Sequence, residues 1–90
     1  MQWEQSAITE LEQLVSVVRD PFREIIKNTA QAHAERYAAI RHRPHVTNKD
    51  AVLGFLRARS HKLNKEGAML LKEHGIDESE FTNFDKDQEK

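Results

Sequence analysis

The chain has 90 residues, no cysteine and a formal net charge of −1 at pH 7. The lack of cysteine excludes disulfides, thiolate nucleophiles and cysteine-held zinc or iron–sulfur centres. The length predicts one domain, and no apolar run approaches the roughly 20 residues that cross a bilayer. Because residues 1–4 are not a basic segment followed by an apolar stretch, we expect a cytoplasmic protein that does not associate with membranes.

The charges are distributed unevenly along the chain. Residues 36–65 contain eight Lys or Arg and a single acid, which gives this segment a charge of +7. The 35 residues before it carry a charge of −3, and the 25 residues after it carry −5. A basic centre between acidic ends favours contact with an anionic partner. That partner is an acidic protein surface, a nucleic acid or the chain's own C-terminal tail.

Apolar residues at helical spacing predict a first helix over residues 4–19 and a longer second helix over residues 21–42. Asp20 is expected to cap the second helix, with Pro21 at its first position. At about 33 Å in length, this helix should form the centre of the domain. Its expected buried stripe consists of Phe22, Ile25, Ile26, Thr29, Ala30, His33, Tyr37 and Ile40.

A third helix is predicted to begin after Thr47, which forms a capping box with Asp50. Gly54 within it indicates a close contact with another helix. The apolar line of this helix passes through Val52, Phe55, Leu56, Arg59 and Leu63.

The predicted C-terminal part begins at Gly67, which is expected to separate the third helix from a short one over residues 68–74. Gly75 is the expected C′ glycine of a Schellman cap, in which Ile76 folds back on Leu71. Asp77 should cap one further turn that carries Phe81 and Phe84.

These elements predict an all-α fold, a small bundle of three main helices around a long central helix with short helical turns at the C-terminus. Residues 1–84 are expected to form a single helical domain. Residues 85–90 are predicted to be a disordered acidic and polar tail.

The histidines are the candidate acid/base and metal-binding groups of this chain. His33 lies in the apolar stripe of the second helix and is predicted to be a buried polar group bonded to a carbonyl or a carboxylate. The alternative is an acid/base group of an enzyme, paired with a carboxylate of the first helix. Because Pro44 separates His42 from His45, these two do not share a regular helix face, and we predict no metal site. No catalytic residues and no cofactor are predicted.

The basic residues give the candidate binding site. Arg59 lies on the apolar line of the third helix, where it either extends along the edge of the core with its charge in solvent or reaches a partner's phosphate or carboxylate. Other basic residues are predicted to form one partner-binding surface: Arg41, Arg43, Lys49, Arg57, Lys62 and Lys65.

Residues 3–56 resemble a known family, the small helical domain of the protochlorophyllide-reductase type. The resemblance rests on Trp3, Ala7, Leu11, Leu14, Val18, Arg19, Arg23, Ile26 and Ala30, and on a second signature formed by Val46, Thr47 and Val52. This domain occurs at the C-terminus of the B subunit of the light-independent enzyme and as short separate proteins. Here Val15 replaces a usual proline, and the segment between the signatures is longer by about two helical turns.

The resemblance implies a helical accessory domain linked to chlorophyll biosynthesis or to nitrogenase-like enzymes, and it carries no catalytic residue to this chain. A weaker likeness, to the histone fold, rests on the long central helix and on the opening of the third helix at Thr47 and Asp50. We therefore predict a non-enzymatic accessory or protein-interaction module that binds an acidic protein surface and is capable of forming a homodimer. The alternative is a small histone-fold-like DNA-binding protein that uses residues 36–65.

Overall fold

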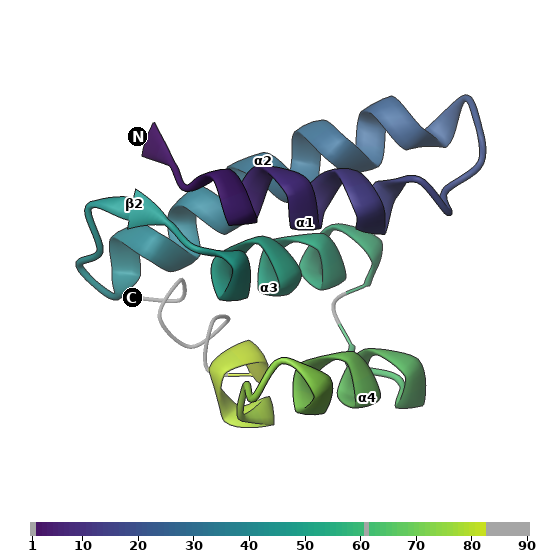
Figure 1. The fold of residues 1–90 in the computed structure, drawn as a ribbon. Helices are drawn as coiled ribbons and strands as arrows, with labels where there is room; N and C mark the ends of the chain where they lie inside the picture. Colours follow the sequence, from purple (N-terminus) through teal and green to yellow (C-terminus); the bar gives the residue numbers. More distant parts are fainter. Residues whose placement is uncertain (1, 61, 83–90) are drawn as a thin grey trace.

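The structure, a computed structural model, describes residues 2–60 and 62–82 (Figure 1). A last helical segment begins at residue 78 and includes residue 82. The predicted small all-α bundle is confirmed, although the helix with neighbours on both sides is the third one rather than the long second helix. Phe84 and the predicted tail at 85–90 lie outside the described residues. The elements are β1 (Gln2–Trp3), α1 (Gln5–Val15), α2 (Phe22–Ile40), β2 (His45–Val46), α3 (Asn48–Arg59) and α4 (Lys65–Glu73).

The centre of the molecule is a very close contact between α2 and α3. A Cβ atom added to Gly54 of α3 would lie 2.5 Å from the carbonyl oxygen of Ala30 and 2.6 Å from the backbone nitrogen of Ala34. These separations are shorter than van der Waals contact, so only glycine fits at this position. The prediction that Gly54 marks a close helix contact is confirmed.

This contact also decides which face of α2 is buried. The fully buried residues of α2 are Ala30, Ala34, Tyr37 and Ala38. The predicted stripe is right at Ala30 and Tyr37 and wrong at three large residues, because Phe22 and Ile25 are each 61% exposed and Ile40 is also exposed. Small alanine side chains permit the backbones of α2 and α3 to approach, whereas a face of Phe and Ile would hold them apart.

α1 packs on this pair through the face that its periodicity predicts. Ala7, Leu11 and Val15 are buried, although the helix ends at Val15 rather than at residue 19. In Figure 1, α3 lies between α1 above and α4 below. Both sides of α3 are therefore covered, and a second group of buried apolar residues lies on the α4 side: Tyr37, Val52, Leu53, Leu71, Ile76 and Phe81.

Two short strands were not predicted. β1 and β2 pair in parallel, with Gln2 opposite His45 and Trp3 opposite Val46. The indole Nε1 of Trp3 also donates a hydrogen bond to Glu35 of α2 at 3.2 Å. Two-residue strands are too short to produce the alternating pattern that identifies a strand in a sequence.

The predicted start of α3 is confirmed, whereas the predicted start of α2 is wrong. The capping box at α3 is confirmed, since Thr47 Oγ1 accepts from the Asp50 backbone and Asp50 Oδ2 accepts from the Thr47 backbone. The predicted cap of α2 at Asp20 is wrong, because α2 begins at Phe22 and Pro21 stands at the N-cap position. Asp20 instead forms an ion pair with Arg23 at 3.5 Å.

The start of α4 also differs from the prediction. The helix begins at Lys65, and the side chain of Asn64 accepts a hydrogen bond from the backbone nitrogen of Gly67 at 2.7 Å. Gly67 is therefore part of the first turn of α4 and does not separate two helices. The asparagine cap explains the earlier start, because it satisfies a backbone donor that has no partner within the helix.

The C-terminal end of α4 agrees with the prediction. Gly75 has a φ of 67°, its backbone nitrogen donates to the Lys72 carbonyl, and the nitrogen of Ile76 donates to the Leu71 carbonyl at 2.8 Å. This is the hydrogen-bond pattern of a Schellman cap. Asp77 caps the next turn by accepting from the backbone of Ser79 at 2.8 Å.

We predict that Gly54→Ala lowers the free energy of unfolding by roughly 1–3 kcal/mol, because the new methyl group overlaps backbone atoms of α2. Urea unfolding followed by circular dichroism measures the change. Gly67→Ala is the control, since its added Cβ first meets the end of the Leu63 side chain at 3.0 Å. That variant should change stability by less than about 1 kcal/mol. Equal effects of the two substitutions would contradict the close approach at Gly54.

Candidate functional site

Arg43, predicted as a partner-binding residue, forms hydrogen bonds with two residues at the start of α3. Its Nη1 atom lies 2.8 Å from Oδ1 of Asp50 and 3.3 Å from Oγ1 of Thr47. The Asp50 side chain is completely buried, so Arg43 supplies the opposite charge that a buried carboxylate requires. Arg43 therefore stabilises the turn between α2 and α3, and its charge is paired within the chain.

Arg41 also forms an ion pair within the chain. Its Nη1 atom lies 2.8 Å from Oε1 of Glu80, and both side chains are about one-quarter exposed. Glu80 belongs to the acidic C-terminal part of the chain. Of the anionic partners considered for the basic segment, the chain's own C-terminal part is thus the one that reaches Arg41.

Arg57 and Arg59 have different surroundings, although both lie near the end of α3. Arg57, predicted as part of the partner-binding surface, is only 3% exposed and donates from Nη2 to the Phe81 carbonyl at 2.8 Å. Its guanidinium carbon also lies 4.1 Å from the centre of the Phe81 ring. Arg59, for which the sequence left open a position along the edge of the core or a contact with a partner, is exposed, and its guanidinium carbon lies 5.7 Å from the centre of the Phe55 ring. The reason is that α3 is covered on two sides, so one apolar line does not describe its buried surface.

We predict that Arg57→Met lowers the free energy of unfolding by roughly 1–3 kcal/mol, because it removes the 2.8 Å hydrogen bond to the buried Phe81 carbonyl and leaves only the longer one, at 3.5 Å, from the Tyr37 hydroxyl. Arg59→Met, the matched control two residues away, should change it by less than about 0.5 kcal/mol. Chemical denaturation of both variants gives the comparison. A larger loss for Arg59→Met would show that the assignment of buried and exposed arginine is wrong.

The remaining predicted residues do not form one surface. Lys49, Lys62 and Lys65 are exposed, as is Arg59, and none of the four forms an ion pair with another described residue. Lys49 lies in the first turn of α3, whereas the other three follow one another from the end of α3 to the start of α4. Because α3 is about 18 Å long, the predicted surface is divided into two separate ends.

The three cations at the α3–α4 end adjoin a groove. The groove has a volume of about 400 Å³, and Leu56, Leu63 and Leu70 are among its apolar lining residues. Arg59 and Lys62 also line it, and Lys65 begins the helix that forms its other side. This combination of apolar surface and unpaired positive charge is the candidate binding site.

His33 is half-buried on α2, so the prediction of a buried polar group holds in part. Within residues 2–60 and 62–82, no group of three His, Cys, Asp or Glu side chains gathers in a way that could hold a metal ion. No helix in the same part of the chain is long and apolar enough to cross a membrane.

Sequence reasoning missed an ion pair between α1 and the end of α4. His74 Nε2 lies 2.8 Å from Oε1 of Glu10, and His74 Nδ1 lies 2.9 Å from the Leu70 carbonyl. Burial lowers the pKa of His74, but the Leu70 carbonyl and the Glu10 carboxylate together raise it above its ordinary value of 6.5. The protonated ring donates to both acceptors, so the charged form fits this position best. No local signal connects residues that are 64 positions apart.

We predict that the ion pair makes stability depend on pH. Because the pKa of His74 is higher in the folded protein than in the unfolded chain, its stabilising effect is complete below about pH 6.5 and is lost as the pH rises through the folded value. The loss should be on the order of 1 kcal/mol, typical of a partly exposed ion pair. The measurement is the free energy of unfolding of wild type and Glu10→Gln from pH 5.5 to pH 8.5, approximately the range in which histidine titrates. If the two proteins differ equally at every pH, the pair does not act in this way.

Comparisons with protein families, with curated proteins and with solved structures found no match for this chain.

Proposed function

We propose that the protein is a non-enzymatic interaction module that binds an acidic segment of a partner protein at the α3–α4 end of the molecule. The observation that supports this is the position of Arg59, Lys62 and Lys65, which are exposed, unpaired among the described residues and adjacent to an apolar groove.

Both components of the surface are needed. A single exposed ion pair contributes at most about 1 kcal/mol, so three cations alone would give weak and salt-sensitive binding. Apolar side chains that become buried in the groove would supply most of the affinity, and the cations would orient the partner and increase the rate of association. An acidic segment that also carries apolar residues satisfies both conditions.

A DNA-binding role has less support. Of the six basic residues that would contact phosphates, Arg43 and Arg41 are paired with carboxylates and Arg57 is buried. Lys49 lies at the opposite end of α3 from the rest. Non-specific DNA binding requires several simultaneous phosphate contacts, and the remaining cations form only a small cluster.

The family resemblance concerns which protein the partner is. It covers residues 3–56, which build the bundle, while the groove lies largely between α3 and α4. A nitrogenase-like reductase as the partner is therefore a separate proposal that rests on sequence resemblance. Measuring binding to the purified subunits of such an enzyme tests it directly.

The test of the proposed function is selection from a random peptide library with the full chain as bait. We predict that wild type enriches peptides that combine acidic with apolar residues and that Arg59→Glu with Lys62→Glu abolishes this enrichment without changing helicity. The matched control is Lys49→Glu with Lys72→Glu, which makes the same change in charge at exposed positions that do not line the groove. If the first variant still enriches the same peptides, the proposed surface is wrong.

A labelled DNA duplex is the competing probe in the same experiment. Micromolar binding that falls steeply with salt, and that Arg59→Glu with Lys62→Glu abolishes, would replace the proposed function with DNA binding. We expect no such binding at moderate salt.

A further inference from the structure

We infer that the groove between α3 and α4 binds an amphipathic helix of the partner, with acidic side chains along one flank of that helix and basic side chains along the other. This inference rests on the proposed function and specifies the chemistry of the segment that the groove recognises.

The groove has opposite charges on its two sides. Arg59 and Lys62 come from the end of α3 and the loop after it, whereas Glu66 and Glu73 come from α4. Glu66 and Glu73 are seven residues apart, which places them two turns apart on the same side of α4. Among the described residues, these two acids form no ion pair with Arg59 or Lys62 across the groove. Their charges are thus available to a partner.

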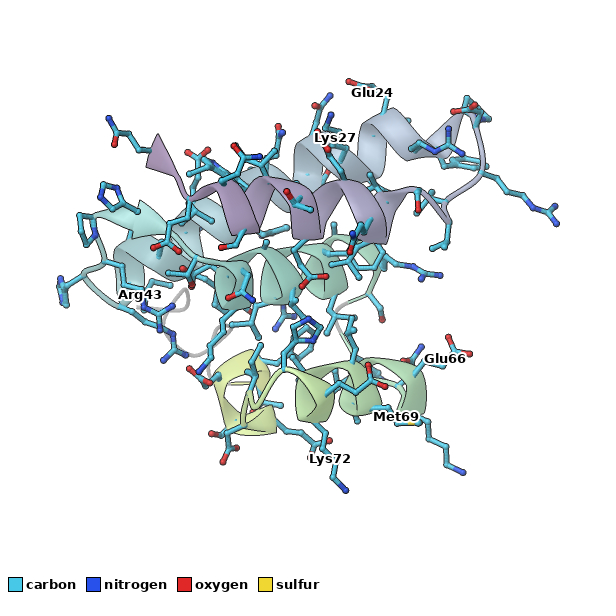
Figure 2. All side chains as sticks on the ribbon, in the orientation of Figure 1. Glu24, Lys27, Arg43, Glu66, Met69 and Lys72 are labelled. Atoms are coloured by element: carbon cyan, nitrogen blue, oxygen red, sulfur yellow. The ribbon has the colours of Figure 1, made fainter. Side chains whose placement is uncertain are left out.

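The apolar lining separates these charges. Leu56, Leu63 and Leu70 are half-buried, and Met69 of α4, which also lines the groove, is 63% exposed. Figure 2 shows Glu66 and Met69 projecting from α4. The unbranched side chain of Met69 adjusts easily to the shape of a bound apolar group. A bound segment would therefore place apolar residues in the middle and polar residues on both flanks, which is the pattern of an amphipathic helix.

A helix suits this groove better than an extended segment. The described elements that line the groove are helices and loops, so they offer no strand edge with which an extended backbone could pair. A helix satisfies its own backbone hydrogen bonds and presents side chains at i, i+3 or i+4, and i+7. α4 has nine residues and is about 13 Å long, so it can accompany two to three turns of a bound helix.

The arrangement of charge selects the partner. A uniformly acidic helix would meet repulsion from Glu66 and Glu73, and a uniformly basic helix would meet repulsion from Arg59 and Lys62. A helix with one acidic and one basic flank avoids both costs. A bound helix can lie in the groove in either direction, and turning it around exchanges the sides on which its two flanks lie. The groove therefore selects a helix that has one acidic and one basic flank, whichever direction the helix runs.

The test uses three libraries of displayed helical peptides that differ only in their flanks: one acidic and one basic, both acidic, or both basic. The apolar anchor positions vary in the same way in each. We expect wild type to enrich the mixed library at least about tenfold over the other two, a difference of roughly 1.4 kcal/mol in binding. Met69→Glu should remove the enrichment, because it places a charge against the apolar anchors.

Two charge-reversed proteins give a readout that misfolding cannot imitate. Glu66→Lys with Glu73→Lys should move the preference to the library with two acidic flanks. Arg59→Glu with Lys62→Glu should move it to the library with two basic flanks. Lys49→Glu is the control and should keep the preference of wild type, because this lysine lies at the other end of α3.

The outcomes separate this inference from the proposed function. If wild type enriches none of the three libraries, or prefers uniform flanks, the groove does not bind a helix of this kind. If it still selects acidic peptides from the random library, and Met69→Glu has no effect on them, the proposed function stands and the helix inference fails. If neither kind of library is enriched, both are wrong.

Discussion

The contact between the backbones of α2 and α3 at Gly54 is the constraint on which the rest of the structure depends. Because there is no room for a side chain between Gly54 and the backbone of Ala30 and Ala34, the small residues of α2 must face α3. The larger residues Phe22 and Ile25 are turned outward as a consequence. A close contact between two helices thus overrides the tendency of the most apolar face to be buried.

The central position of α3 explains which of its charged side chains are buried and which are exposed. With α1 and α2 on one side and α4 on the other, α3 buries Arg57 and leaves Arg59 exposed. Arg57 then binds the Phe81 carbonyl and helps to hold the C-terminal part of the chain. A charge that looked available for a partner is instead required by the fold.

Polar contacts connect distant parts of the chain to this C-terminal part. They include the bond from Arg57 to Phe81, the ion pair of Arg41 with Glu80 and the ion pair of His74 with Glu10. They connect the end of α4 and the segment after it to α1, to the end of α2 and to α3, and a groove lies between α3 and α4. The basic centre and the acidic C-terminal part therefore partly neutralise each other within the molecule, and the charges that remain at the groove lie on its two sides.

Many local features were determined by the sequence itself, although the predicted cap at Asp20 was wrong. Helical periodicity, the capping box of Thr47 with Asp50 and the glycine cap at Gly75 depend on neighbours within one or two turns, and the structure has all of them. The buried face of α2, the burial of Arg57 and the pairing of His74 with Glu10 were decided only by the tertiary structure. Each depends on which helix packs against which, and this is a property of the whole chain because the partners are far apart in sequence.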